Sequence, residues 1–266
     1  MASEAMAERV SGNGFIAALD QSGGSTPGAL RLYGIPESAY TDQNEMFRLM
    51  HAMRVRIVTA PVFTGERILG AILFEGTMDG HVEGMPTSRF LWDRRGVVPF
   101  VKVDKGLEEE TDGVRLMKPM PGLNTLVSRA LELGVYGTKM RSLINTASQP
   151  GIAAIVSQQF EAAGETARRG LMPIIEPEVT ISILDKPEAE RMLLEEIVRH
   201  LDVLPAGQQV MLKLTIPTER DLYAELASHK GVKRVVALSG GYSRKQACQL
   251  LAQNHGRFCR KVRFMT

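Results

Sequence analysis

The chain alternates short β-rich runs with longer amphipathic helical runs through almost its whole length. Alternation of this kind predicts βαβ units, in which parallel strands lie side by side with helices on the outside. The expected strands cover residues 15–20, 68–75, 97–104, 136–141, 172–179, 209–216 and 234–239. The expected helices cover residues 43–58, 123–133, 152–169, 186–201, 219–229 and 243–254. Seven strands are clear, and an eighth near the end of the chain would close them into a (β/α)8 TIM barrel.

The length of the chain fits one domain of this kind. It has 266 residues, of which 44% are hydrophobic, and α/β barrels commonly have about 250 residues in a single domain. No low-complexity segment, charge block or linker interrupts the pattern, so we expect a single domain over residues 1–266. The Gly- and Pro-containing stretch 106–124 is expected to be an excursion on the barrel.

Composition excludes several classes of function. The 32 Lys and Arg residues face 30 acidic residues, and the net charge of +2 gives no reason to expect a nucleic-acid partner. Cys248 and Cys259 are the two cysteines, which excludes a disulfide scaffold and suits a reducing cytoplasm. Neither a signal peptide nor an apolar run of about 18 residues is present, so we expect a cytoplasmic protein without a membrane partner. The sequence is compatible with a homo-oligomer, in which the partner is a second copy of the chain.

Charged residues recur on one face at the C-terminal ends of five expected strands. A barrel strand alternates between the lumen and the helix-facing side, and the lumen is apolar except at the mouth, where barrels keep their active sites. The charged residues that share this face are Asp20, Lys102 with Asp104, Lys139 with Arg141, Glu176 with Glu178, and Lys213. Five such strands indicate one polar mouth that combines cations with proton-transferring carboxylates. The alternative is a structural charge network.

One lysine stands alone among apolar neighbours. In the strand 209–216, which reads QVMLKLTI, Lys213 lies between Leu212 and Leu214 and shares a face with Met211 and Thr215. Desolvation and neighbouring positive charge both favour the neutral amine, which is the nucleophilic form. The alternative is a lysine in an ion pair, or one that snorkels at a strand end.

Two Ser-Gly-Gly loops add phosphate-binding potential. One loop runs from Asp20 to Ser25 after the first strand, and the other contains Ser239 and Gly240 after the seventh. Backbone N–H groups in such loops can bind phosphate, although each motif is also a common turn. None of the five histidines stands at an expected strand end, and no HxxH or CxxC spacing occurs. We therefore expect neither a metal site nor a cofactor.

Seven segments, taken in order, resemble one enzyme family: GFIAALDQSGGST, ILGAILFEGTMD, FVKVDKG, YGTKMR, MPIIEPEV, MLKLTIPTE and VVALSGGYS. They are similar to class I fructose-bisphosphate aldolases, the bacterial type with the AALDQSGGS opening, over about residues 11–254. The resemblance implies a metal-independent lyase of glycolysis and gluconeogenesis. It would reversibly cleave fructose 1,6-bisphosphate to dihydroxyacetone phosphate and glyceraldehyde 3-phosphate through a lysine Schiff base.

The resemblance also implies roles for individual residues. Lys213 matches the Schiff-base lysine, Glu176 the general acid/base and Glu178 its close partner. Asp20 matches the aspartate that positions the lysine and the substrate hydroxyls. The remaining matches are Lys102, Lys139 and Arg141, which meet substrate oxygens and phosphate, and Ser25, Ser239 and Gly240, which bind the phosphate of the dihydroxyacetone half.

The end of the chain departs from the family pattern. Related aldolases continue into an eighth strand with a SFSRAL-like motif and a final helix, whereas this chain reads HGRFCRKVRFMT from residue 255. Phe258-Cys-Arg260 resembles the Phe-Ser-Arg portion, which makes Arg260 a candidate phosphate ligand and predicts an incomplete eighth strand and helix. Three functions stay open. They are an active aldolase, an impaired homologue that only binds phosphosugars or a partner, and another Schiff-base barrel lyase with a different phosphosugar.

Overall fold

All seven expected strands form, and they pair in parallel in one curled sheet. The structure, a computed structural model, describes residues 2–254. The sheet order is β1-β2-β5-β7-β8-β9-β10, and every pairing along it is parallel. The strands are β1 (Phe15–Leu19), β2 (Ile68–Leu73), β5 (Val98–Lys102), β7 (Gly137–Ile144), β8 (Met172–Val179), β9 (Val210–Thr215) and β10 (Val232–Leu238).

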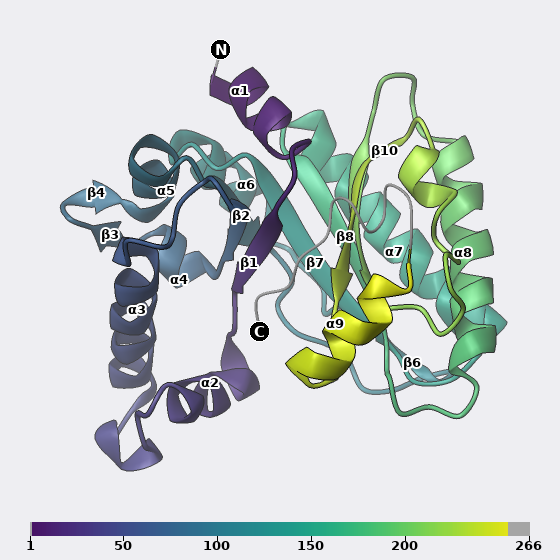
Figure 1. Cartoon of the computed structure of the whole chain (residues 1–266), viewed down its shortest axis with the longest axis horizontal. Helices are drawn as coiled ribbons and strands as arrows, with labels where there is room; N and C mark the ends of the chain where they lie inside the picture. The colour runs from purple at the N-terminus through teal and green to yellow at the C-terminus, as the bar shows by residue number, and fades with distance from the viewer. Residues whose placement is uncertain (1, 255–266) are drawn as a thin grey trace.

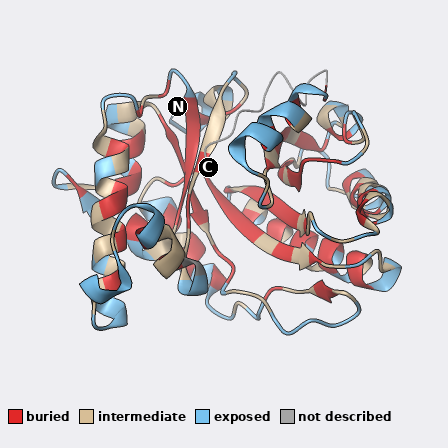
Figure 2. Ribbon diagram, turned by 60° about the horizontal axis from the view of Figure 1, so that its bottom comes forward, coloured by how far each residue is buried: buried red, intermediate tan, exposed pale blue. Residues whose placement is uncertain are grey.

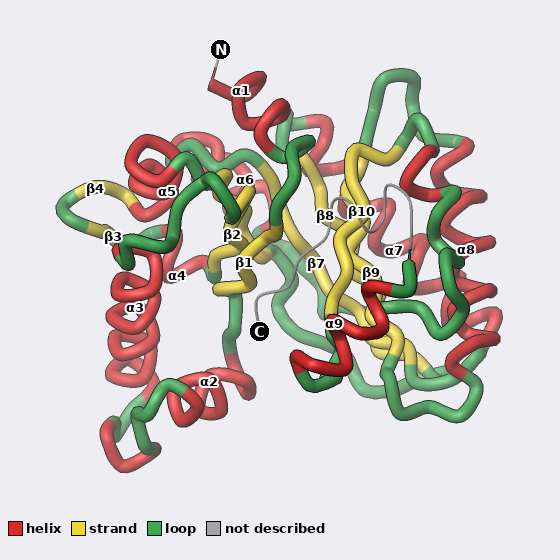
Figure 3. The backbone as a smooth tube through the Cα atoms, viewed as in Figure 1, coloured by secondary structure: helices red, strands yellow, loops and turns green. Residues whose placement is uncertain are grey.

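The curled sheet has an open seam between its first and last strands (Figure 3). Among residues 2–254 the pairing path ends at β1 on one side and at β10 on the other. Arg234 of β10 crosses to the segment before β1, where its guanidinium donates to the carbonyl oxygens of Val10 and Gly12 at 2.7 Å and of Gly14 at 3.1 Å. Over residues 2–254 the fold is thus TIM-barrel-like with an incomplete end, as the sequence predicts.

Most helices cover the outside of the sheet, whereas α2 (Thr26–Leu32) lies beyond the end of β1 and packs against α3 (Gln43–Thr59) (Figure 1). The helices on the sheet turn their buried faces toward the strands and their exposed faces outward (Figure 2). Local caps fix where several begin: Asp42 accepts a hydrogen bond from the Glu45 amide at 2.8 Å, and Ser243 forms a capping box with Gln246. The helices that follow α3 are α4 (Glu75–Met78), α5 (Thr87–Arg95), α6 (Leu123–Glu132), α7 (Gln149–Arg168), α8 (Lys186–Asp202) and α9 (Arg244–Ala252).

One expected helix is wrong. Residues 219–229 form turns that end in the single 3-10 turn η3 (Leu226–Ser228). Asp221 has a φ of 61°, a left-handed conformation that an α-helix cannot contain. Its amide donates to the side chain of Asn254 at 3.0 Å, so a long-range contact replaces the helical bond that the local pattern favoured.

Inside the curled sheet an apolar layer lies beneath a polar one. Ile72, Phe100, Ile174 and Met211 form a buried cluster with Met6 of α1 (Ala2–Arg9), a helix at the end of the sheet where β1 begins (Figure 1). Side chains on a strand return to the same face every two residues. The residues two positions after Phe100, Ile174 and Met211 therefore share the face of this cluster. Those residues are Lys102, Glu176 and Lys213.

The excursion after β5 returns to the sheet. Its short strand β6 (Val114–Arg115) pairs antiparallel with the end of β7. Before β5, the strands β3 (His81–Val82) and β4 (Met85–Pro86) form a separate two-stranded ribbon. No helix between residues 2 and 254 is long and apolar enough to cross a membrane.

Candidate active site

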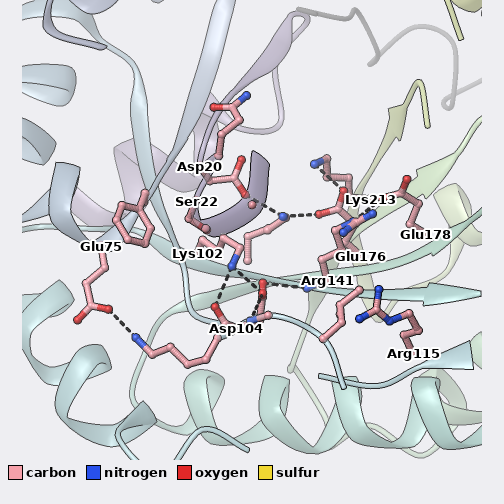
Figure 4. A pocket seen from close by; sticks show the side chains of 18 of the residues that line it. Asp20, Ser22, Glu75, Lys102, Asp104, Arg115, Arg141, Glu176, Glu178 and Lys213 are labelled. Carbon is pink, nitrogen blue, oxygen red and sulfur yellow. Dashed lines mark hydrogen bonds and ion pairs between the residues drawn. The ribbon is translucent and has the colours of Figure 1, made fainter. Parts of the chain in front are cut away.

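A cavity of about 900 Å³ lies at the carboxyl ends of the strands (Figure 4). This is the end at which barrels place their active sites. Seven of the residues selected from the sequence line it together: Asp20, Lys102, Lys139, Arg141, Glu176, Glu178 and Lys213. They come from five different strands or strand ends, so the curl of the sheet assembles one polar cluster from sites scattered along the chain.

Lys139 is the centre of this cluster. Its buried ammonium lies 2.8 Å from Asp20 Oδ2 and 2.6 Å from Glu176 Oε2. The other Glu176 oxygen, Oε1, lies 2.7 Å from Lys213 Nζ. Two carboxylates and two amines thus alternate in a chain from Asp20 through Lys139 and Glu176 to Lys213. Such a chain can relay protons while its net charge stays low.

The electrostatics of the chain follow from this pairing. Burial alone would raise the pKa of Asp20, but the charges of Lys139 and Lys213 outweigh it and lower that pKa to about 2. Burial likewise opposes the charge on Lys139, yet Asp20 and Glu176 raise the pKa of its ammonium well above the usual range. Burial and the same two lysines act in opposite directions on Glu176, and the lysines prevail and lower its pKa. Asp20, Lys139 and Glu176 are therefore ionised at neutral pH.

The backbone of Glu176 is fixed from behind the sheet. Gln159 of α7 is buried, and its Oε1 accepts a hydrogen bond from the Glu176 amide at 2.8 Å. One strand away, the Thr215 hydroxyl of β9 accepts from the Val179 amide at 2.9 Å and donates to the Val179 carbonyl at 3.0 Å. These side chains hold the ends of β8 and β9 together, and with them Glu176 and Lys213. The sequence signal that could have identified Gln159 is a glutamine among the apolar positions on one face of this helix.

Two more ion pairs lie beside the chain of charges from Asp20 to Lys213. Lys102 Nζ is 2.6 Å from Asp104 Oδ1, and Arg141 Nε is 2.5 Å from Glu178 Oε2. The sequence placed Asp104 on the same strand face as Lys102 but gave it no role. Its carboxylate proves to be buried and to line the cavity.

The sequence analysis also missed Arg54. This buried residue of α3 donates to the Gln21 carbonyl at 2.5 Å and to the Thr77 hydroxyl at 2.6 Å. Burial lowers the pKa of its guanidinium to about 10. It fixes the loop that follows Asp20, part of which lines the cavity. An arginine in an amphipathic helix is ordinarily assigned to the solvent face, so only the packing reveals this contact.

The phosphate-binding residues expected from the resemblance are not all in the cavity. Ser25 ends the short turn η1 (Gly23–Ser25), whose two glycines line it. Ser239 and Gly240 follow β10 and are not among the described residues of its lining. Gly240 has a φ of 62°, a conformation that glycine adopts without strain. Arg260 lies outside the described residues. The roles of these four residues remain predictions.

The carboxylates of the site form ion pairs with lysine and arginine side chains of the chain itself. Among residues 2–254 no group of three or more His, Cys, Asp or Glu side chains could hold a metal ion. Each of Asp20, Asp104, Glu176 and Glu178 instead contacts a lysine or arginine.

Comparisons with known proteins agree on one family. Residues 2–185 match the family model described as glycolytic, fructose-bisphosphate aldolase class-I. The fructose-bisphosphate aldolase class 1 of Synechocystis sp. is 55% identical over 243 residues, which are 91% of this chain and 81% of that protein. A solved structure of the fructose-bisphosphate aldolase from Plasmodium falciparum, in complex with TRAP and a small-molecule inhibitor, superposes with a TM-score of 0.72 at 22% identity. That alignment covers 99% of this chain and 83% of that one, and it supports the fold. The chain therefore belongs to the class I fructose-bisphosphate aldolases.

Proposed function

We propose that the chain catalyses the reversible aldol cleavage of fructose 1,6-bisphosphate through a Schiff base on Lys213. The observation that carries the proposal is the pairing of Lys213 Nζ with Glu176 Oε1 at 2.7 Å, at the end of a buried chain of charges. A lysine nucleophile needs a nearby base to accept its proton and return it. Glu176 meets this need, and Lys139 keeps it ionised.

Schiff-base formation follows from these contacts. Lys213 transfers a proton to Glu176 and attacks C2 of the open-chain ketose, forming a C–N bond. The carbinolamine then loses its hydroxyl as water, with a proton supplied by Glu176, and the protonated iminium remains. Glu176 ends this stage as a carboxylate again, ready for a second proton transfer.

Carbon–carbon cleavage uses the iminium as an electron sink. The C4 hydroxyl gives its proton to a carboxylate of the cluster, the C3–C4 bond breaks, and its electron pair moves to form the enamine. Glyceraldehyde 3-phosphate leaves. The carboxylate returns this proton to C3 of the enamine, and water hydrolyses the iminium to release dihydroxyacetone phosphate and regenerate the Lys213 ammonium. The Lys139 ammonium stabilises the negative charge that develops beside it.

The two phosphates of the substrate need separate cationic or N–H-rich ends of the cavity. We assign the phosphate nearer C2 to the Ser-Gly-Gly loops, with Ser25, Ser239 and Gly240, and with Arg260 as a further ligand. The positively charged pair Lys102 and Arg141 serves the phosphate at C6. This division is supported by the position of both cations in the cavity lining, on strands distant from the seam.

Trapping with borohydride tests the proposal directly. Reduction in the presence of dihydroxyacetone phosphate should add one ligand mass to the chain, and peptide mass spectrometry should locate it on Lys213. The variant Lys213→Met is the matched control and should show neither trapping nor cleavage. Trapping on Lys102 or Lys139, or no trapping in a folded wild-type sample, would contradict the assignment.

A coupled cleavage assay separates the proposal from its rivals. An impaired homologue would bind fructose 1,6-bisphosphate without turnover, and a different lyase would trap its ligand but cleave another ketose phosphate faster. The complete charge chain and the 55% identity to a named aldolase favour the active enzyme. We further propose that residues 1–266 act as one catalytic domain, since the site draws on strands from β1 to β9. We also propose that the protein works in the cytoplasm, which its low cysteine content suits.

A further inference from the structure

Asp104 and Glu75 both line the cavity without a role in the reaction, but of the two only Asp104 contacts a cation assigned to the substrate, Lys102, whereas Glu75 contacts Lys105 and Arg129. Asp104 follows β5, lines the cavity, and has a buried side chain. We propose that Asp104 is a positioning residue that sets the spacing of Lys102 and Arg141 for the C6 phosphate of the substrate. The inference rests on the proposed function and concerns how that function selects a bisphosphate.

The first contact of Asp104 fixes the Lys102 ammonium. Its Nζ lies 2.6 Å from Asp104 Oδ1 and donates to the Asp104 backbone carbonyl at 2.8 Å (Figure 4). Two acceptors on one residue hold a flexible four-carbon side chain in one place, which saves rotamer entropy when a ligand binds. A lysine has three N–H donors, so one donor of this cavity-lining amine is left for a ligand.

The second contact of Asp104 fixes the backbone of Arg141. The ladder between β5 and β7 pairs Lys102 with Lys139, and the Val103 amide then donates to the Lys139 carbonyl at 2.9 Å. At the next step the Arg141 amide donates to Asp104 Oδ2 at 3.2 Å. A side-chain carboxylate thus takes the place of a ladder carbonyl where β5 leaves the sheet. The Arg141 side chain is held separately, by Glu178 at 2.5 Å.

Both oxygens of Asp104 are therefore committed to different donors. Oδ1 accepts from Lys102 and also from the Gly106 amide at 3.3 Å, while Oδ2 accepts from the Arg141 amide. An asparagine at this position would turn an NH2 group toward one of these donors, and one contact would be lost. An aspartate supplies both acceptors, and it joins the Lys102 ammonium to the backbone of Arg141, both of which line the cavity.

The test compares two substrates that differ only in the C6 phosphate. In Asp104→Asn, kcat/KM for fructose 1,6-bisphosphate should fall by about tenfold or more, the loss typical of one charge-assisted hydrogen bond. Most of the loss should appear in KM. The value of kcat/KM for fructose 1-phosphate should stay within about twofold of wild type, because that substrate does not use this end of the cavity. Asp104→Glu keeps the charge but lengthens the side chain, and should restore only part of the loss.

A matched control separates positioning from general destabilisation. Glu190 of α8 is also buried, contacts Lys186, and accepts from the Thr218 amide at 2.8 Å, but it does not line the cavity. Glu190→Gln should lower the thermal midpoint, as Asp104→Asn does, and leave the preference for the bisphosphate unchanged. The affinity for hexitol 1,6-bisphosphate, measured by calorimetry, gives a readout that needs no turnover, and Asp104→Asn should weaken it by a similar factor.

The outcomes are distinct. An equal fall for both substrates would show that Asp104 only supports the fold, and a lower KM for the bisphosphate would show that it merely offsets the Lys102 charge. Either result overturns the inference. A wild-type chain that neither traps dihydroxyacetone phosphate nor cleaves either ketose would instead refute the proposed function, and unchanged hexitol bisphosphate affinity in Asp104→Asn would still refute the positioning role.

Discussion

Replacing Lys139 with methionine tests the charge chain at its centre. The change keeps the length and most of the volume of the side chain, but it removes the ammonium from between Asp20 and Glu176. Glu176 keeps its contact with Lys213 at 2.7 Å. The carboxylate of Asp20 loses its direct ionic partner while remaining buried. We expect the variant to fold, to be less stable than wild type, and to lose catalytic activity.

The magnitude follows from the burial of the pair. Removing one partner of a buried ion pair typically costs about 3–5 kcal/mol, because the other charge is left uncompensated. The lowered pKa of Asp20 supports this scale. The decrease from 3.8 to about 2 corresponds to about 2 kcal/mol of stability at neutral pH, at about 1.36 kcal/mol per pKa unit. For a chain of this size, a loss of 3–5 kcal/mol lowers the thermal midpoint by roughly 10 °C.

The pH dependence has a definite sign. The folded-state pKa of Asp20 lies below its ordinary value, so its contribution is fully present above pH 3.8 and is lost as the pH falls toward about 2. In Lys139→Met the carboxyl pKa values rise, because burial remains and the nearest positive charge is gone. The stability difference between the two proteins should be largest near neutral pH. It should shrink as acid protonates the carboxylates of the variant.

Urea unfolding at pH 7 and at several lower pH values measures this difference. The double variant Asp20→Asn/Lys139→Met provides the control, since it removes the uncompensated charge and should recover about 1–2 kcal/mol of the loss. A loss below about 1 kcal/mol at pH 7 in Lys139→Met, or a double variant no more stable than the single one, would refute the reasoning.

Three further predictions address other parts of the molecule. Arg234→Met removes three hydrogen bonds across the seam. It should destabilise the fold by about 3 kcal/mol or more in urea unfolding, given about 1–3 kcal/mol for each buried acceptor left unsatisfied. Arg234→Lys should recover part of this loss, and an unchanged midpoint would contradict the role of Arg234 in bridging the seam. Gly137→Ala would place a Cβ 2.1 Å from the Met172 carbonyl oxygen, so β7 and β8 must separate; differential scanning calorimetry should show a lower thermal midpoint, whereas Gly28→Ala, with open space around it, should not lower it. EDTA should leave cleavage activity unchanged in the coupled assay, and a loss that zinc restores would require a metal mechanism.

Periodicity made the sheet and most of the site predictable from the sequence. A strand exposes alternate residues to opposite faces, so the positions of Lys102, Lys139, Glu176 and Lys213 on their strands already placed their side chains on the lumen face. The parallel βαβ order then placed the carboxyl ends of all strands at one end of the barrel. Fold class, the location of the site and its charged residues thus follow from local rules.

Contacts between distant segments were decided by tertiary structure alone. The pattern at 219–229 favours a helix, but the positive φ of Asp221 and its bond to Asn254 produce turns. Arg54 of α3 contacts the loop after Asp20, which lies more than thirty residues earlier in the chain. The residues around Arg54 in the sequence do not indicate this contact.

The ion pairs within the site were also decided by tertiary structure. The sequence offered cations and carboxylates at one end of the sheet, but many pairings of them were compatible with strand spacing. The curl of the sheet determines which atoms meet, and it places the ammonium of Lys139 between Asp20 and Glu176 and the carboxylate of Asp104 between Lys102 and the Arg141 amide. Local periodicity determines the face that a side chain occupies, whereas the distance between two side chains on different strands depends on how the whole sheet packs.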